Sequence, residues 1–122
     1  MRLLLCPPDF YGIEYEINTW MHRGRDANPE LALEQGQRLH DILAALGAQI
    51  ELLTPQPGLP DMVFTANAGL VIGNRFFPSQ FRHKERQGEQ PHFEAWFEDN
   101  GHKIDRLQPD RVFEGEGDAL FC

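Results

Sequence analysis

The sequence predicts an α/β fold. Three observations support this: an amphipathic helix signal over residues 29–46, short aliphatic segments before and after it, and a later group of strand signals around a second, shorter helix. Helices that alternate with strands are typical of α/β proteins. The 122 residues are enough for one domain with a sizeable core. We see no linker or low-complexity segment that would divide the chain.

The N-terminal part predicts a strand, a second extended segment and a long loop. Residues 2–6 form an apolar run that ends at a proline pair, as expected for a buried strand that leads into a loop. Apolar and polar residues alternate over 13–18, which is the periodicity of a strand with one exposed face. Residues 18–28 show no periodicity, so we expect a loop, and loops of this length are often functional.

The strongest local signal predicts a helix from about Pro29 to Leu46. Asn28 can cap its N-terminus, Pro29 suits the first helical position, and Gly47 follows its end. We expect one apolar stripe at helical spacing to be buried. This stripe comprises Ala32, Gly36, Leu39, Ile42, Leu43 and Leu46.

Extended segments dominate the rest of the chain. Residues 48–53 predict a strand, and the proline-rich segment 54–60 predicts a rigid connector. Residues 62–72 are extended and apolar-rich, and a Gly-Asn pair joins them to 75–77 in a predicted hairpin. The other expected elements are a helix over residues 92–100 and strands over 103–107 and 111–113.

Charge and cysteine usage exclude several classes of protein. The net charge is −8, which argues against a nucleic acid or a membrane as partner and favours a cationic ligand. The N-terminal apolar run is too short for a signal peptide, and two cysteines at opposite ends make no disulfide framework, so we expect a cytoplasmic protein. Because zinc spacings and nucleotide-binding glycine motifs are missing from the sequence, we predict no metal and no cofactor.

Three polar clusters are candidates for chemistry. Asp61 follows a proline turn, where it can cap the turn, or it can share a pocket with Asn67, whose small neighbours leave room for a ligand. Arg82 begins a charged run over 82–86, which is either a solvated surface or a loop whose Arg82 guanidinium forks onto a substrate carboxylate.

The third cluster is acidic. Glu114, Glu116 and Asp118 alternate with two glycines, and such carboxylates repel one another unless a cation lies among them. The cation would be a metal ion or an organic cation such as a guanidinium. A plain acidic turn between strands is the remaining interpretation.

Four segments together resemble a known family. CPPDFYGIEYEINTWM, LPDMVFTANAGLV, FRHKER and FEGEGDAL are similar to the N-terminal half of the guanidino-group-modifying pentein superfamily, which includes amidinotransferases, dimethylarginine dimethylaminohydrolases and arginine deiminases. The resemblance implies a partial pentein-type α/β propeller, with about two of five ββαβ modules in residues 1–122. In this family a cysteine attacks the guanidinium carbon, a histidine acts as acid and base, and carboxylates grip the guanidinium nitrogens.

The family motifs map onto individual residues of the chain. Asn67 stands where the family usually carries a guanidinium-binding Asp, which weakens the case for arginine itself as the substrate. The acidic block has one extra residue, and within it we favour Glu114. The resemblance thus implies catalytic roles for Glu114 and Glu116, and substrate binding by Asp61, Asn67, Arg82 and Asp118.

The leading hypothesis is the N-terminal part of an amidinotransferase or hydrolase that acts on the guanidinium group of an arginine-like small molecule. Its catalytic Cys and His would lie in a missing C-terminal segment, Cys122 would not be the nucleophile, and the chain alone would be inactive. The alternatives are a non-catalytic pentein-like binding module and an α/β domain with an acidic metal-binding loop. Uncovered sheet edges would also favour self-association of the fragment.

Overall fold

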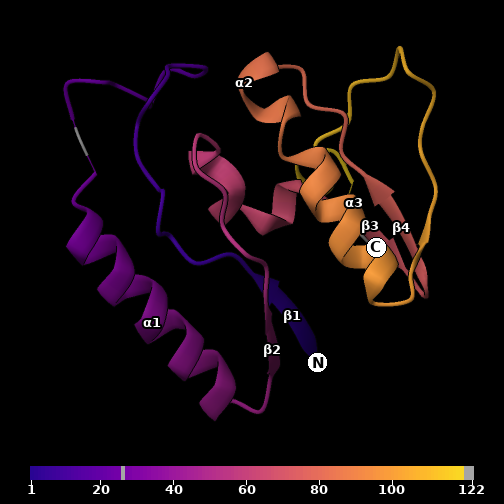
Figure 1. Ribbon diagram of the computed structural model, residues 1–122, viewed down its shortest axis with the longest axis horizontal. Coiled ribbons are helices and arrows are strands. Elements are labelled where there is room, and N and C mark those ends of the chain that lie inside the picture. Colours follow the sequence, from indigo (N-terminus) through magenta and orange to yellow (C-terminus); the bar gives the residue numbers. More distant parts are fainter. Residues whose placement is uncertain (26, 120–122) are drawn as a thin grey trace. The chain divides into compact units, whose positions relative to one another are not determined.

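The computed structural model describes residues 1–25 and 27–119. The chain forms two compact units, Met1–Val63 and Phe64–Cys122. Both mix helix and strand, so the predicted α/β class is confirmed at this level (Figure 1). Among the described residues, every helix is too short or too polar to cross a membrane.

The first unit is a βαβ arrangement. Strands β1 (Arg2–Leu5) and β2 (Gln49–Leu52) pair in parallel, with Leu3 opposite Ile50. Parallel neighbours need a long crossover, and helix α1 (Pro29–Ala45) lies within it (Figure 1). The two predicted strands and the helix between them are therefore confirmed.

Helix α1 begins where its capping residues predict. The Asn28 side chain accepts a hydrogen bond from the Leu31 amide at 3.0 Å, and Pro29 occupies the first turn. The helix is followed by Gly47 at φ 86°, a left-handed conformation that suits glycine. Local sequence signals at the two ends were sufficient to predict this element.

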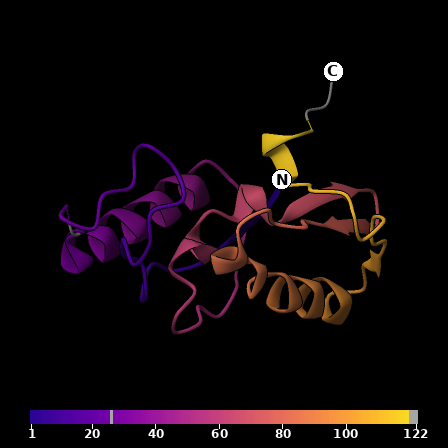
Figure 2. The ribbon, with the colours of Figure 1, turned by 90° about the horizontal axis from the view of Figure 1, so that it is seen from above.

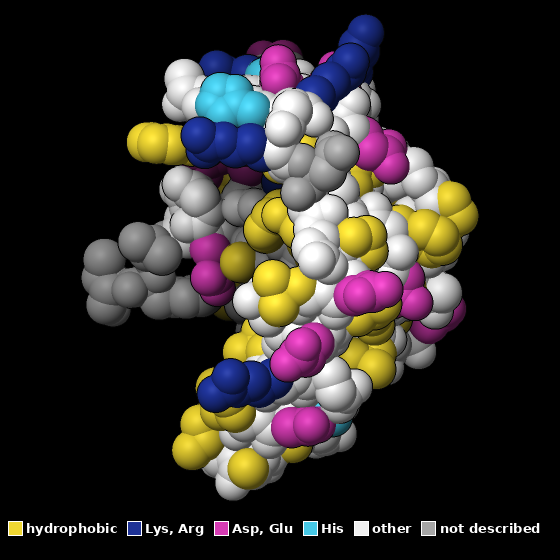
Figure 3. Space-filling view, turned by 90° about the vertical axis from the view of Figure 1, so that its left-hand side faces the viewer, with side chains coloured by type: hydrophobic (Ala, Val, Ile, Leu, Met, Phe, Trp, Pro, Cys, Tyr) yellow, Lys and Arg dark blue, Asp and Glu magenta, His cyan; other side chains and the backbone are white. Residues whose placement is uncertain are grey.

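The predicted stripe on α1 is only partly right, because no residue of this helix is fully buried. Ala32, Gly36 and Leu43 are half-buried, and a Cβ on Gly36 would lie 3.1 Å from the Pro8 ring. Small residues thus let the helix approach the loop after β1. The larger side chains beside this line stay in solvent, since Leu39, Ile42 and Leu46 are 50%, 49% and 79% exposed. Figure 3 shows hydrophobic side chains at the surface of this part of the molecule.

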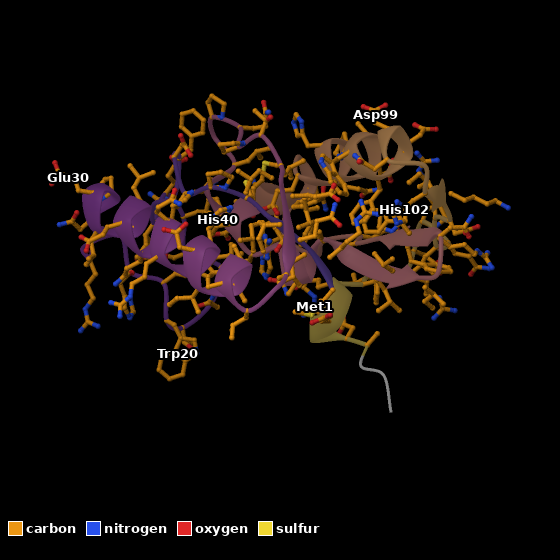
Figure 4. All side chains as sticks on the ribbon, turned by 90° about the horizontal axis from the view of Figure 1, so that it is seen from below. Met1, Trp20, Glu30, His40, Asp99 and His102 are labelled. Atoms are coloured by element: carbon orange, nitrogen blue, oxygen red, sulfur yellow. The ribbon has the colours of Figure 1, made fainter. Side chains whose placement is uncertain are left out.

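The predicted strand over residues 13–18 is wrong. The segment has no strand partner, although its side chains alternate between half-buried and exposed as the sequence pattern implies. An extended backbone alternates its side chains whether or not it joins a sheet. The following loop contains turns, with the Arg23 amide bonded to the Glu16 carboxylate at 2.8 Å, and Trp20 projects from it, 87% exposed (Figure 4).

The second unit is a three-stranded sheet with a helix on one face. Strands β3 (Gly69–Ile72) and β4 (Arg75–Pro78) form the predicted hairpin, and β5 (Lys103–Ile104) adds in parallel to the other side of β4. Figure 2 shows helix α3 (Gln90–Asp99) along one face of this sheet. Two short 3-10 turns, η1 (Pro60–Val63) in the first unit and η2 (Thr65–Asn67), replace the first part of the extended segment predicted at 62–72. Residues 111–113 form only one antiparallel bridge, between Phe113 and Gln80.

Aromatic rings form the core between α3 and the sheet. Phe93 and Phe76 are 0% and 1% exposed, and the Phe76 and Phe97 rings stack with their centroids 3.8 Å apart. His102 lies edge-on to Phe97, between the helix and the strands, whereas Asp99 projects from the outer face of α3 (Figure 4). The i, i+3, i+4 aromatic spacing of α3 explains which side faces the sheet.

An ion pair joins α3 to the segment after β5 and makes stability depend on pH. The Arg106 guanidinium donates two hydrogen bonds to Glu94 at 2.5 and 3.1 Å, and Gln90 donates a third at 2.7 Å. Burial raises the pKa of Glu94, but these hydrogen bonds outweigh it, so the pKa lies below its usual value. A carboxyl with a depressed pKa stabilises the fold above its unfolded pKa, about 4.3, and this stabilisation is lost as the pH falls through the folded pKa.

We therefore expect Glu94→Gln to lower the free energy of unfolding at pH 7 by about 1 kcal/mol or less, since Arg106 is largely exposed. The difference from wild type should shrink as the pH falls toward 3. Urea unfolding at both pH values measures it. Asp99→Asn, on the same helix, is the control and should match wild type. An equal deficit at both pH values would show that Glu94 acts through packing and not through its charge.

Candidate functional site

Five of the six predicted site residues lie in one cluster of the second unit. Asn67 ends η2, Arg82 follows β4, and Glu114 and Asp118 flank the 3-10 turn η3 (Gly115–Gly117). Glu116 lies within this turn and is exposed. Asp61 belongs to the first unit, in η1, where it is 4% exposed.

Glycine is required where the acidic turn meets η2. Gly115 is buried and has φ 61°, a left-handed conformation. A Cβ on Gly115 would collide with the carbonyl oxygen of Ala66 and would lie 3.0 Å from the carbonyl carbon of Asn67. The close approach that the glycine-rich block predicted is therefore to the protein's own backbone.

Hydrogen bonds hold the acidic turn in shape. The Glu114 amide donates to the Asp118 carboxylate at 2.8 Å, and the Arg82 amide donates to the Glu114 carboxylate at 3.2 Å. Arg82 thus contributes its backbone to the cluster, while its side chain is exposed. The carboxylates of Glu114, Glu116 and Asp118 keep acceptor capacity toward solvent, which suits a ligand rich in N–H donors.

Asn67 is held through both its backbone and its side chain. Its carbonyl oxygen accepts a hydrogen bond from the hydroxyl of Ser79, a residue that is 0% exposed, at 2.5 Å. Its side-chain oxygen accepts from the Arg86 guanidinium at 3.3 Å. Its side-chain nitrogen lies near Gly117, 3.8 Å from the position that a Cβ on this glycine would take. The Asn67 side chain therefore lies between the acidic turn and the guanidinium of Arg86.

Arg86 is the residue that the sequence analysis missed. It lies in the short helix α2 (Lys84–Gln87), its side chain is 9% exposed, and it forms two hydrogen bonds, 2.8 and 2.9 Å long, to the fully buried carboxylate of Glu89. The guanidinium also lies 4.4 Å from the ring centroid of Phe81. The three-residue spacing of Arg86 and Glu89 was the available signal: the Glu89 amide donates to the Arg86 carbonyl at 2.9 Å, and this turn between α2 and α3 brings the two side chains together.

Other reactive groups lie outside this cluster. Cys6 belongs to the first unit and is buried, as expected for an inert thiol. Cys122 lies outside the described residues. Within residues 1–25 and 27–119 there is no group of three or more His, Cys, Asp or Glu side chains that could hold a metal ion. The described cluster can bind and orient a cation, but it contains no evident nucleophile.

Comparison with known proteins identifies relatives along the whole chain. No family model matches it. The chain is 51% identical over 122 residues to the bifunctional arginine dihydrolase/ornithine cyclodeaminase ArgZ of Synechocystis, covering 99% of this chain and 17% of the relative. It is 34% identical over 120 residues to the N(G),N(G)-dimethylarginine dimethylaminohydrolase of Mycobacterium tuberculosis, covering 98% and 39% of the two chains.

Solved structures agree with these sequence matches. A crystal structure of the N-terminal domain of ArgZ bound to product has a TM-score of 0.92 and 52% identity, over 98% of this chain and 44% of that one. A dimethylarginine dimethylaminohydrolase adduct, at 19% identity, shares the fold with a TM-score of 0.74 over 93% and 42% of the two chains. The chain thus spans less than half the length of these relatives.

Proposed function

Because this chain is homologous to the N-terminal part of arginine-modifying enzymes of the pentein superfamily, we propose that it supplies the substrate-binding carboxylates of such an enzyme. The observation that carries this proposal is the acidic turn. The turn carries three carboxylates, and its Gly115 packs so closely against the backbone of Ala66 and Asn67 that a Cβ at this position would collide. Such a cluster of acceptors matches the planar, donor-rich guanidinium cation.

We propose arginine as the substrate. The expectation against arginine depended on the amide at Asn67, yet crystals of the relative AgrE, which is 50% identical to this chain, contain L-arginine. Neighbouring carboxylates can supply the negative charge that an amide lacks. The reaction we favour is hydrolysis, because the relatives are named dihydrolases or dimethylaminohydrolases.

In this proposal the nucleophilic Cys and the acid–base His belong to a polypeptide segment outside the 122 residues. The acidic turn orients the guanidinium and keeps it protonated, so that the thiolate attacks the carbon of a cation and not that of a neutral, less electrophilic guanidine. Correct orientation of the guanidinium carbon lowers the barrier because it removes the entropic cost of bringing the reacting atoms together. The 122-residue chain alone should bind substrate weakly and release no product.

A chimera tests the proposal. The chain replaces the matching first part of the N-terminal domain of ArgZ, and release of ornithine or citrulline from arginine is measured. We expect turnover by the chimera and none by the chain alone. Turnover by the chain alone would disprove the need for a second segment. A folded chimera without activity, beside an active ArgZ domain, would disprove the assignment of the substrate-binding role.

The role of Arg82 is tested separately in the same chimera. If its exposed guanidinium forms two parallel hydrogen bonds to the substrate carboxylate, Arg82→Lys should raise KM about tenfold with little change in kcat, because an ammonium cannot form that bidentate pair. Lys84→Arg, a nearby exposed change, is the control. An unchanged KM would mean that Arg82 contributes only its backbone amide, which any residue except proline provides.

A further inference from the structure

One asparagine of the chain is followed directly by a glycine. The sequence contains five asparagines, and only Asn100 has this neighbour, Gly101. Asparagine is a thermally labile residue, because the backbone nitrogen of the next residue can attack its side-chain amide carbon. A glycine at that next position has no side chain to obstruct the attack, and its backbone turns more freely than that of other residues. Asn100 is also exposed, so water reaches it.

The pair lies at the C-terminal end of α3, between Asp99 and His102 (Figure 4). Gly101 has φ 82°, and its amide donates to the Glu98 carbonyl at 3.0 Å. The His102 amide donates to the Phe97 carbonyl at 2.9 Å. These two hydrogen bonds around a left-handed glycine form a Schellman motif. The edge-on contact of the His102 and Phe97 rings, with centroids 5.1 Å apart, adds the side-chain packing that often accompanies this motif.

This turn restrains both groups that would react. The attacking atom is the Gly101 nitrogen, whose N–H is donated to Glu98. The leaving group is the side-chain nitrogen of Asn100, which donates to the Trp96 carbonyl at 2.8 Å. Asn100 has ψ 17°, which turns the Gly101 nitrogen away from the Asn100 side chain. The two groups can therefore meet only after the hydrogen bonds at the end of the helix open.

We propose that Asn100 is a site of spontaneous deamidation and that the Schellman turn of α3 controls its rate. When the turn opens, the Gly101 nitrogen bonds to the side-chain carbon of Asn100, and the bond from that carbon to the amide nitrogen breaks. The Gly101 nitrogen gives its proton to the leaving amide, which departs as ammonia, and a cyclic succinimide remains. Water then opens this ring at either carbonyl group. The product is aspartate at position 100, or isoaspartate, whose backbone runs through the former side chain.

Either product should destabilise the second unit. A carboxylate has no N–H to donate to the Trp96 carbonyl, and it adds negative charge at the negative end of the helix dipole, beside Asp99. Isoaspartate also inserts a methylene into the backbone between α3 and β5. Strand β5 pairs with β4 through Lys103 and Ile104 alone, so it has few contacts that could absorb the change. Deamidation would thus make the stability of the chain decline with its age.

The test follows deamidation of the full 122-residue chain by mass spectrometry. The purified chain is incubated at mildly alkaline pH, in native buffer and in guanidinium chloride. Peptide mapping measures how much of each asparagine has lost its amide, and the four other asparagines are internal references because none precedes a glycine. His102→Ser removes the ring contact of the Schellman turn. His92→Ser, near the other end of the same helix, is the matched control.

We expect Asn100 to deamidate faster than the other asparagines in native buffer, and about tenfold faster again in guanidinium chloride, where the turn is open. His102→Ser should raise the rate in native buffer about threefold and leave the rate in denaturant unchanged. His92→Ser should match wild type in both solutions. Asn100→Asp should lower the melting temperature, whereas Asn74→Asp, the same change in an exposed hairpin turn, should not.

Deamidation at Asn100 that is no faster than at the exposed Asn18 in native buffer would overturn the assignment of the site. Equal rates in native buffer and in denaturant would overturn the role of the turn, as would equal acceleration by both histidine variants. If His102→Ser does not fold, low concentrations of guanidinium chloride replace it, and the rate should rise before the chain unfolds. None of these measurements involves arginine, so the outcome is independent of the proposed function.

Discussion

Gly115→Ala should destabilise the second unit by about 1–3 kcal/mol and remove substrate binding, because alanine at this position has both an unfavourable backbone conformation and a steric collision. Its backbone has φ 61°, which costs any residue with a Cβ. The added Cβ would also collide with the backbone of Ala66 and Asn67, which cannot move aside as a flexible side chain can. Relief would require the acidic turn to separate from η2.

Urea unfolding and arginine binding by calorimetry measure the two effects, with the chimera as the binding protein. Gly117→Ala is a demanding control because it lies two residues away in the same turn. Its φ is not in the left-handed region, and its Cβ would make an ordinary contact of 3.8 Å with the Asn67 side chain. Equal losses in both variants would contradict the argument, since they would show that the whole turn tolerates no side chain.

Glu114→Gln should lower kcat for arginine in the chimera by roughly 10²-fold while leaving stability nearly unchanged. The Glu114 carboxylate accepts a hydrogen bond from the Arg82 amide at 3.2 Å, and the Glu114 amide is bonded to Asp118, so the side chain is held in place before any ligand arrives. Glutamine keeps the shape and one acceptor oxygen but removes the charge. The carboxylate charge keeps the guanidinium protonated and holds its carbon in the orientation that the thiolate attacks, and a neutral amide does neither as well.

Steady-state kinetics on Glu114→Gln, Glu116→Gln and Asp118→Asn assign the role within the block. We expect the first variant to lose the most, because Glu114 is half-buried whereas the other two carboxylates are exposed. Thermal unfolding of each variant separates loss of chemistry from loss of fold. A neutral result at Glu114 with a large loss at Glu116 or Asp118 would move the assignment along the turn.

Local signals predicted individual elements well. The cap at Asn28 and the proline after it located the start of α1, and Gly73-Asn74 located the hairpin, because both effects act within a few residues. The predicted helix at 92–100 is close to the observed Gln90–Asp99. Patterns whose meaning depends on a neighbouring strand or sheet were less informative. Residues 13–18 alternate without a strand beside them, and the leucines of α1 have the right spacing but only a small sheet to cover.

The candidate site was likewise only partly predictable from the sequence. The acidic block and Asn67 were recognisable from residue types and from their family context, and the fold brings them together. Choosing between Arg82 and Arg86 was beyond the sequence, since both belong to one charged run. Arg82 lies in the loop before α2 and is exposed, whereas Arg86 lies within α2 and is buried against Glu89 and Phe81.

By itself, the sequence determined the α/β class, the resemblance to guanidino-modifying enzymes, the negative charge and the residue types available to bind a cation, because these depend on composition, order and short-range spacing. Tertiary structure alone decided which end of the Asn67 amide faces the acidic turn and why Gly115 must be a glycine. Both depend on contacts between residues 19 to 50 positions apart in the chain, and such separations leave no periodic signal in a single sequence.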